Sequence, residues 1–200
     1  MMVLWLVLAY LAGSIPTSFA VAKLADGRDL REFGSRNLGA TNLYRMLGLK
    51  AAVPVALFDI AKGTVPVLLA WRAGGPVWWP YAIGVAAVLG HVFSPLVGFK
   101  GGKGVATAAG VFLALAPGSL GVGAVIWAGV VYASGYVSLG SLIAAAVFAA
   151  SIPLLYPDRA ELLWAAISVC GFVVFTHRAN IRRLLDGTEA RFGHHKAPPA

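Results

Sequence analysis

The stretch Gly98-Phe99-Lys100-Gly101-Gly102-Lys103-Gly104 separates two long apolar runs of the sequence. Its four glycines and two lysines bring bare backbone N–H groups and cationic side chains together, an arrangement by which proteins hold phosphate groups. The residues from Val105 onward are typical of a helix start, whose N-terminal dipole would favour an anion at the same place. The stretch therefore predicts either a phosphate-binding turn or an ordinary cytoplasmic loop between two membrane-embedded segments.

The composition is that of a protein with several membrane-spanning helices. Of the 200 residues, 59% are hydrophobic and only 12% are charged, and the mean hydropathy is +0.79. The net charge of +8 would suit nucleic acid, but the sequence has no basic helix or basic strip interleaved with aromatic residues, so we expect no nucleic-acid partner. The single cysteine, Cys170, lies in an apolar run, which excludes an internal disulfide and argues against a cysteine-based metal site.

Seven apolar segments are candidates for membrane-spanning helices, because each approaches the length that a bilayer requires. They lie at 2–23, 51–72, 77–97, 105–116, 119–134, 138–155 and 161–177. No basic residue precedes the first segment, and the segment contains small polar residues. We therefore interpret it as a retained span and not as a cleaved signal peptide. Pro117-Gly118-Ser119 divides a long apolar stretch into either two short spans or one kinked helix.

The distribution of cations decides between these two possibilities. Six cations flank or lie within the loop 24–50, two lie in the glycine- and lysine-rich loop, and five follow the last span, whereas only Arg72 and Arg159 would fall on the opposite side. Because cytoplasmic loops carry the excess of Lys and Arg, two spans are favoured. We predict an all-α polytopic membrane protein with seven transmembrane helices, its N-terminus outside and its C-terminus cytoplasmic. Residues 1–192 would form a single domain, and 193–200, with His194 and His195, a disordered tail.

The loop 24–50 contains a polar stretch whose chemistry suits an anion. It reads Gly34-Ser35-Arg36-Asn37-Leu38-Gly39-Ala40-Thr41-Asn42-Leu43-Tyr44-Arg45. Ser35, Thr41 and Asn42 can donate neutral hydrogen bonds, and Arg36 and Arg45 can bind phosphate oxygens in pairs. An ordinary loop that obeys the positive-inside rule is the alternative, but it would need neither the paired glycines nor the Asn/Thr run.

Several polar residues fall inside or at the ends of the apolar spans. Asp59 and Lys62 are three residues apart, so on a helix they share a face and would form a structural ion pair. We expect His91 to be packed and hydrogen-bonded near the cytoplasmic end of its span. Ser138 and Ser141 could offer hydroxyl groups to a cytoplasmic cleft, although helix capping would also place serines there.

The last span ends in a polar stretch that contains His177 and Asn180. If the helix continues through it, these two residues lie three apart on one face. A histidine at this place can serve as a general base or donate a hydrogen bond to phosphate, and a structural role is the alternative.

Some chemistry is absent from the sequence. Its few carboxylates are scattered, so the clustered aspartates that hold Mg²⁺ in nucleotide or CDP-alcohol chemistry are missing. The glycine- and lysine-rich loop departs from the nucleotide-binding P-loop, because Val97 stands where its first glycine belongs and Gly104 where its Ser/Thr belongs. No histidine is followed by the aspartate of a His-x4-Asp acyltransferase pair.

Taken in order, the polar blocks resemble the acyl-phosphate:glycerol-3-phosphate acyltransferases of bacterial phospholipid synthesis, the PlsY family. The resemblance runs from residue 13 to residue 189, and its joint order and spacing make it specific. It rests on Gly13-Ser14-Ile15-Pro16, the stretch 34–42 with Arg45, Asp59 with Lys62-Gly63, Gly90-His91, the stretch 99–107, Ser138-Leu139-Gly140-Ser141, and the stretch 177–184 with Gly187 and Glu189.

The resemblance implies a seven-span enzyme of the bacterial inner (plasma) membrane whose active site faces the cytoplasm. It would transfer a fatty acyl group from a long-chain acyl phosphate to the sn-1 hydroxyl of glycerol 3-phosphate, giving lysophosphatidic acid and phosphate. It implies no metal, no cofactor and no obligate protein partner, and the acyl tail would lie in a groove open to membrane lipid. The alternatives are an organic-phosphate transporter or exchanger, which should be polar at the membrane midplane, and a structural membrane subunit.

Two phosphate dianions can be brought together only by cationic and N–H donors from two sides, which suggests roles for the residues of the resemblance. The residues expected to act on glycerol 3-phosphate in catalysis are His177, Asn180, Ser35, Arg45 and Lys103, with the backbone of Gly101, Gly102 and Gly104. The residues expected to face the acyl phosphate are Thr41, Asn42, Gly39 and Ser141. Asp59, Lys62 and Glu189 are expected to be structural. Direct attack by the glycerol hydroxyl is the preferred route, with either His177 or a substrate phosphate oxygen taking the proton.

Overall fold

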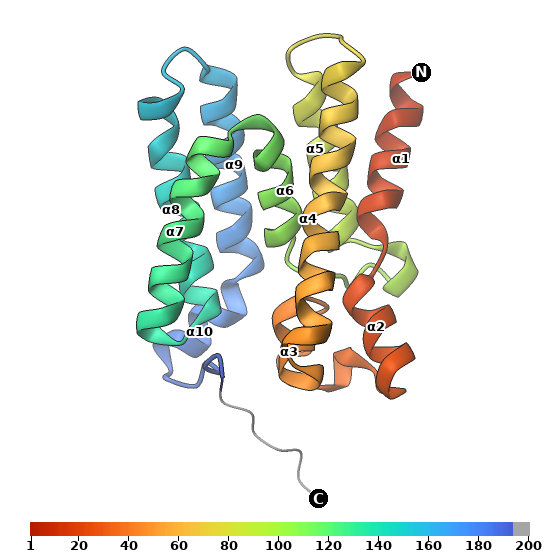
Figure 1. Cartoon of the computed structure of the whole chain (residues 1–200), viewed down its shortest axis with the longest axis vertical. Coiled ribbons are helices and arrows are strands. Elements are labelled where there is room, and N and C mark those ends of the chain that lie inside the picture. Colours follow the sequence, from red (N-terminus) through yellow and green to blue (C-terminus); the bar gives the residue numbers. More distant parts are fainter. Residues whose placement is uncertain (194–200) are drawn as a thin grey trace, which may run out of the picture. The chain divides into compact units, whose positions relative to one another are not determined.

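The computed structural model describes residues 1–193, which contain ten α-helices, two short 3-10 helices and no β-strand (Figure 1). The predicted all-α class is therefore confirmed. Backbone contacts divide the chain into two compact units, Met1–Pro117 and a second unit that begins at Gly118. The expectation of a single domain over 1–192 stays a prediction. Within the expected tail, His194, His195 and the residues after them lie outside the described residues.

The first unit is built from six α-helices. They are α1 (Met2–Ser14), α2 (Thr17–Asp26), α3 (Ala40–Leu47), α4 (Leu49–Arg72), α5 (Trp79–Val92) and α6 (Val105–Leu115), with the 3-10 turns η1 (Leu30–Glu32) and η2 (Pro95–Val97). Helix α1 packs along α5, and α4 packs along α6 and α5 (Figure 1). The first apolar segment is broken at Ile15 and Pro16, because proline has no N–H for a helix interior. Under these helices, a small apolar cluster that includes Leu30, Leu43 and Val55 supports the segment 30–47.

Glycines let the helices of the first unit approach until their backbones touch. A Cβ atom on Gly13 of α1 would lie 2.0 Å from the carbonyl oxygen of Ala87 in α5, and one on Gly90 would lie 2.1 Å from that of Tyr10. Between α4 and α6, a Cβ on Gly110 would lie 1.9 Å from the oxygen of Ile60. Small residues are what close packing of helices in membranes requires, since lipid removes the hydrophobic drive for association.

The second unit contains α7 (Pro117–Ser134), α8 (Val137–Leu155), α9 (Ala160–Thr176) and α10 (Arg178–Leu185). Pro117 opens α7, where its missing N–H costs nothing. Gly135, with φ of 76°, turns the chain between α7 and α8. Helix α8 packs against α9, and α10 contacts both. The division of the long apolar stretch, expected at Pro117-Gly118-Ser119, falls at Ala116, directly before Pro117.

Five helical segments are long and apolar enough to cross a membrane among the described residues. These are Met2–Asp26, Leu49–Arg72, Trp79–Val97, Pro117–Ser134 and Val137–Leu155. Helices α9 and α10 make a sixth if the pair, bent by 60°, is one span. Helix α6, expected as the short fourth span, has only 11 residues. The seven-span count and the sides on which the termini lie remain predictions.

The contact between α4 and α6 predicts that Gly110→Ala destabilises the protein. The added Cβ would meet a backbone carbonyl that cannot move alone, and such overpacking costs about 1–3 kcal/mol. The measurement is the thermal unfolding midpoint in detergent. Gly129→Ala is the matched control, because no atom lies within 4 Å of its new Cβ and alanine favours a helix by up to about 1 kcal/mol. Equal midpoints for the two variants would contradict the close backbone contact.

Candidate functional site

The glycine- and lysine-rich loop folds back onto the end of α5. Gly98, Phe99 and Gly104 have φ of 66°, 61° and 79°, so the loop uses the left-handed region at both of its ends. Helix α6 begins at Val105, as the sequence predicts. The chain direction at Gly104 therefore turns the first N–H groups of α6 toward the loop, which is the arrangement that favours an anion at a helix N-terminus.

Two backbone N–H groups of this loop donate hydrogen bonds to the end of α5. The N–H of Gly101 donates to the carbonyl oxygen of Val92 (2.9 Å), and that of Gly102 donates to the carbonyl oxygen of His91 (3.2 Å). These bonds fix the loop to α5 without a ligand. The substrate-binding role expected of Gly101, Gly102 and Gly104 stays a prediction, and for the first two the N–H groups are already paired.

The close approach of the loop to His91 and Leu38 explains why residues 101 and 102 are glycines. A Cβ on Gly101 would lie 2.0 Å from the His91 carbonyl oxygen. One on Gly102 would lie 2.2 Å from Nε2 of the His91 ring and 2.8 Å from the carbonyl oxygen of Leu38. The loop therefore lies between the end of α5 and the segment before α3, and the half-buried Lys103 follows directly.

The polar stretch 34–45, expected as a loop, contains the helix α3. Its Asn42 is only 1% exposed and organises the segment before it. The side-chain amide nitrogen of Asn42 donates to the carbonyl oxygens of Leu30 (3.1 Å) and Phe33 (2.9 Å), and its oxygen accepts the N–H of Ser35 (3.0 Å). Because both amide hydrogens of Asn42 are committed to protein carbonyls, the structure gives this residue a structural position, whereas the sequence placed it on the acyl phosphate.

The other candidates of this stretch are less buried than Asn42. Ser35 precedes α3, Gly39 is its N-terminal flanking residue, Thr41 lies in its first turn and Arg45 in its last, and all four are half-buried. The side chain of Arg45 comes near Gly34, whose Cβ would lie 3.9 Å from Arg45 Cδ. The first unit thus gathers hydroxyl and guanidinium groups next to the segment that touches the glycine- and lysine-rich loop, and their roles toward substrate stay predictions.

In the second unit, Glu189 is the centre of a buried polar cluster. One carboxylate oxygen, Oε1, accepts Ser138 Oγ and Asn180 Nδ2, each at 2.6 Å, and the other accepts Arg183 Nε at 2.7 Å. Burial alone would raise the pKa of this carboxyl group, but the three hydrogen bonds together hold the pKa below its ordinary value. Since a carboxylate only accepts, the bond also fixes which end of the Asn180 amide faces Glu189.

His177 lies at the bend between α9 and α10. The helix axis turns by 60° at this residue and does not continue straight. The expectation that His177 and Asn180 share one face assumed a continuous helix. The ring Nδ1 lies 2.8 Å from the carbonyl oxygen of Val173. A carbonyl oxygen can only accept, so Nδ1 carries the hydrogen, and in the neutral ring Nε2 carries the lone pair. Ser141, in contrast, donates to Val137 of its own helix (2.9 Å).

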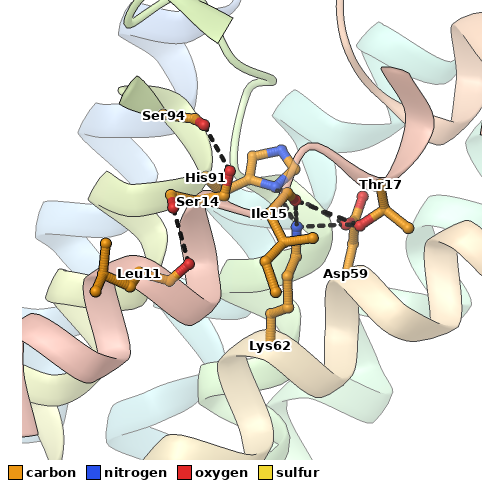
Figure 2. Close-up of polar contacts among 8 residues, drawn as sticks. All are labelled: Leu11, Ser14, Ile15, Thr17, Asp59, Lys62, His91 and Ser94. Atoms are coloured by element: carbon orange, nitrogen blue, oxygen red, sulfur yellow. Dashed lines mark hydrogen bonds and ion pairs between the residues drawn. The ribbon is translucent and has the colours of Figure 1, made fainter. Parts of the chain in front are cut away.

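The expected ion pair within the spans is present, and it belongs to a larger network (Figure 2). Lys62 Nζ lies 2.7 Å from Asp59 Oδ1, and each side chain is 3% exposed. Lys62 also reaches the carbonyl oxygen of Ile15 (2.8 Å) and Nδ1 of His91 (3.3 Å), while Thr17 donates to Asp59 (3.2 Å). His91 is therefore packed and hydrogen-bonded, as expected. The contributions of Ile15 and Thr17 were not predicted, because they depend on the break between α1 and α2.

The fold and these side chains define a multi-pass helical membrane protein whose loops and helix ends carry groups able to bind anions. The chain belongs to the glycerol-3-phosphate acyltransferase family, whose model matches residues 3–187. It is therefore an acyltransferase of the PlsY type, an integral membrane protein of phospholipid synthesis, and the expected resemblance is confirmed.

The relatives support this membership over nearly the whole chain. A glycerol-3-phosphate acyltransferase of Geobacter sulfurreducens is 46% identical over 187 residues, covering 92% of this chain and 94% of the relative. Glycerol-3-phosphate acyltransferase 2 of Bacillus anthracis is 44% identical over 190 residues, covering 94% and 98%. The crystal structure of the integral membrane glycerol 3-phosphate acyltransferase PlsY (YgiH) in its glycerol 3-phosphate form is 41% identical, with a TM-score of 0.90 over 96% of each chain. Its lysophosphatidic acid form is 38% identical, with a TM-score of 0.86.

The Glu189 cluster predicts an acid-dependent loss of stability that Glu189→Gln removes. Because the folded-state pKa is depressed, the stabilisation is fully present above the unfolded value of about 4.5 and is lost as the pH falls through the folded-state pKa. Near pH 7 the variant should be about 1.5–3 kcal/mol less stable, the range for hydrogen bonds to a charged group. The measurement is the thermal midpoint of both proteins from pH 7 downward.

The two midpoints should converge as the pH falls below the ordinary range of a glutamate. Glu32→Gln serves as the control because Glu32 is exposed, and its midpoint should follow that of the wild type at each pH. A difference between Glu189→Gln and the wild type that stays constant with pH would contradict the role of the charge.

Proposed function

We propose that the protein transfers a long-chain acyl group from an acyl phosphate to the sn-1 hydroxyl of glycerol 3-phosphate, giving lysophosphatidic acid and inorganic phosphate. The observation that carries the proposal is that solved relatives of 41% and 38% identity, each covering 96% of this chain, are a glycerol 3-phosphate form and a lysophosphatidic acid form. These two molecules differ by one acyl group, so they are the acceptor and the product of a single acyl transfer.

An acyl phosphate as the donor fits the residues of this chain. It is a mixed anhydride, so its carbonyl carbon is already activated and needs no nucleophile on the enzyme. The oxygen of the glycerol hydroxyl bonds to that carbon, the bond from the carbon to the phosphate oxygen breaks, and inorganic phosphate leaves with the electron pair. The resemblance to the PlsY family and the missing His-x4-Asp pair support this donor over a thioester.

The candidate residues divide by chemistry between the two anions. Lys103, Arg45 and Ser35, with His177 and Asn180, would hold glycerol 3-phosphate, since cationic and neutral donors offset the repulsion between two phosphates. Thr41, Gly39 and Ser141 would lie toward the acyl phosphate, whose tail would extend into membrane lipid. Asn42 would act at one remove, by holding the segment that carries Ser35.

The tautomer of His177 supports its assignment as the base. With the hydrogen on Nδ1 held by the Val173 carbonyl, Nε2 is the basic nitrogen of the neutral ring, and it would be the atom that takes the proton of the glycerol hydroxyl. The same hydrogen bond stabilises the imidazolium that results. A phosphate oxygen of the substrate is the alternative acceptor, and the kinetics of His177 variants distinguish the two.

The side of the membrane follows from the charge distribution. The segment 24–50, the loop 98–104 and the residues after α9 carry most of the Lys and Arg, so we propose that they face the cytoplasm of a bacterial cell across its inner membrane. Transport is less well supported than acyl transfer, because the charged residues expected within the spans, Asp59 and Lys62, are satisfied by protein groups.

The direct test uses the purified protein in detergent with palmitoyl phosphate and glycerol 3-phosphate. Phosphate release that requires both substrates, together with 1-acyl lysophosphatidic acid as the product, is the expected result. Palmitoyl-CoA in place of palmitoyl phosphate should give no product. Turnover with palmitoyl-CoA at a similar rate would overturn the donor, and uptake of glycerol 3-phosphate into vesicles without product would overturn the reaction.

His177→Ala should lower kcat by about 10²–10⁴, the usual contribution of a general base, with the Michaelis constants changed less. Ser168→Ala, in α9 before the bend, is the control, because its exposed hydroxyl donates to the Trp164 carbonyl of its own helix, and it should keep the wild-type kinetics. A retained kcat with a raised KM for glycerol 3-phosphate would instead make His177 a binding residue.

A further inference from the structure

The three hydrogens of the Lys62 ammonium group are matched by three acceptors (Figure 2). They are Asp59 Oδ1 at 2.7 Å, the carbonyl oxygen of Ile15 at 2.8 Å and Nδ1 of His91 at 3.3 Å. An ammonium group has donors only, so Nδ1 of His91 must accept and cannot carry a hydrogen. His91 is therefore neutral, with its single ring hydrogen on Nε2.

The protonated nitrogen of His91 lies against the glycine- and lysine-rich loop. Nε2 occupies the place that a side chain of residue 102 would take, 2.2 Å from an ideal Cβ on Gly102. The backbone oxygens of His91 and Val92 accept the N–H groups of Gly102 and Gly101. His91 thus contacts the loop through both its carbonyl oxygen and its ring, and its ring contact is with Gly102, the residue directly before Lys103.

The groups that set the orientation of the His91 ring lie on the side of the ring that faces away from the loop. Asp59 and Lys62 belong to α4, and Ile15 lies at the break between α1 and α2, so two separate segments determine which edge of His91 faces Gly102. The other neutral tautomer, with its hydrogen on Nδ1, would direct an N–H at the Lys62 ammonium group, which is electrostatically unfavourable in a buried site.

We propose that His91 is a positioning residue of the acyltransferase. Held in one tautomer by the Asp59–Lys62 pair, its ring supports Gly102 and so fixes the turn that presents Lys103 to the phosphate of glycerol 3-phosphate. The proposal rests on the function proposed for Lys103, and it extends the role of the ion pair from stability alone to the geometry of substrate binding.

The kinetic test is His91→Asn in the assay with palmitoyl phosphate. The asparagine oxygen can replace Nδ1 as an acceptor for Lys62, but the shorter side chain leaves Gly102 without its support. We expect a KM for glycerol 3-phosphate raised by about tenfold or more, and a KM for palmitoyl phosphate within about twofold of the wild type. A merely structural residue would lower the amount of folded enzyme and leave both Michaelis constants unchanged, and that result would overturn the proposal.

Two comparisons sharpen this test. Ser94→Ala removes the buried hydrogen bond from the Ser94 hydroxyl to the Ser14 carbonyl but keeps the backbone bond from Phe99 of the loop to the Ser94 carbonyl, so its KM values should stay at the wild-type level. In a Lys103→Ala background, His91→Asn should raise the KM for glycerol 3-phosphate little further, because a residue that acts through another is not additive with it. A KM raised equally by Ser94→Ala, or full additivity with Lys103→Ala, would count against His91.

A spectroscopic measurement on the wild-type protein keeps the proposal testable if His91→Asn does not fold. With ¹⁵N-labelled histidine, His91 should show an unprotonated Nδ1 and a protonated Nε2, and a hydrogen on Nδ1 would overturn the proposed geometry. This readout does not depend on turnover. Failure of the acyltransferase assay in the wild type therefore overturns the proposed function, whereas a wrong tautomer overturns only the role of His91.

Discussion

The first unit depends on one buried charge, the ammonium group of Lys62. An unpaired charge inside an apolar span costs several kcal/mol, so a lysine is stable there only where acceptors surround it. Asp59, one turn earlier on α4, supplies the countercharge. The remaining acceptors come from other segments, namely the carbonyl of Ile15 and the ring of His91. The requirement to satisfy Lys62 therefore fixes α1, α4 and α5 against one another at one level.

The break between α1 and α2 is part of this solution. Within a continuous helix, the Ile15 carbonyl would be committed to a backbone N–H four residues later. Pro16 interrupts the helix, which leaves that carbonyl outside the helical ladder and directed toward Lys62, while Thr17 at the start of α2 donates to Asp59. The glycine contacts of α1 with α5 bring the two backbones close together, so that the groups at the end of α1 lie within reach of this network. Packing and electrostatics thus require each other here.

The sequence predicts the parts of this structure that depend on local pattern. Hydropathy locates the apolar helices, and the spacing of three between Asp59 and Lys62 predicts their pairing, because both depend on a single helix. The helix α3 was missed, since its glycine-flanked, polar residues are typical of a loop and its burial of Asn42 depends on distant carbonyls. The bend at His177 was missed as well, because the sequence there contains neither proline nor glycine. Of the candidate site, the residue types could be predicted but their hydrogen-bond partners could not.

The two histidines for which we propose functional roles are held in opposite tautomers, and the difference suits the proposed chemistry. His177 gives its Nδ1 hydrogen to a carbonyl, which leaves a lone pair on Nε2 that can accept a proton. His91 accepts at Nδ1 from an ammonium group, which leaves it an N–H on Nε2 and no lone pair on the side of the loop. The proposed reaction between an acyl phosphate and a phosphate ester needs one proton acceptor and otherwise only donors near the anions. An unprotonated Nε2 beside the loop could donate no hydrogen bond to an anion, and the buried Lys62 prevents this by holding the lone pair of the ring at Nδ1.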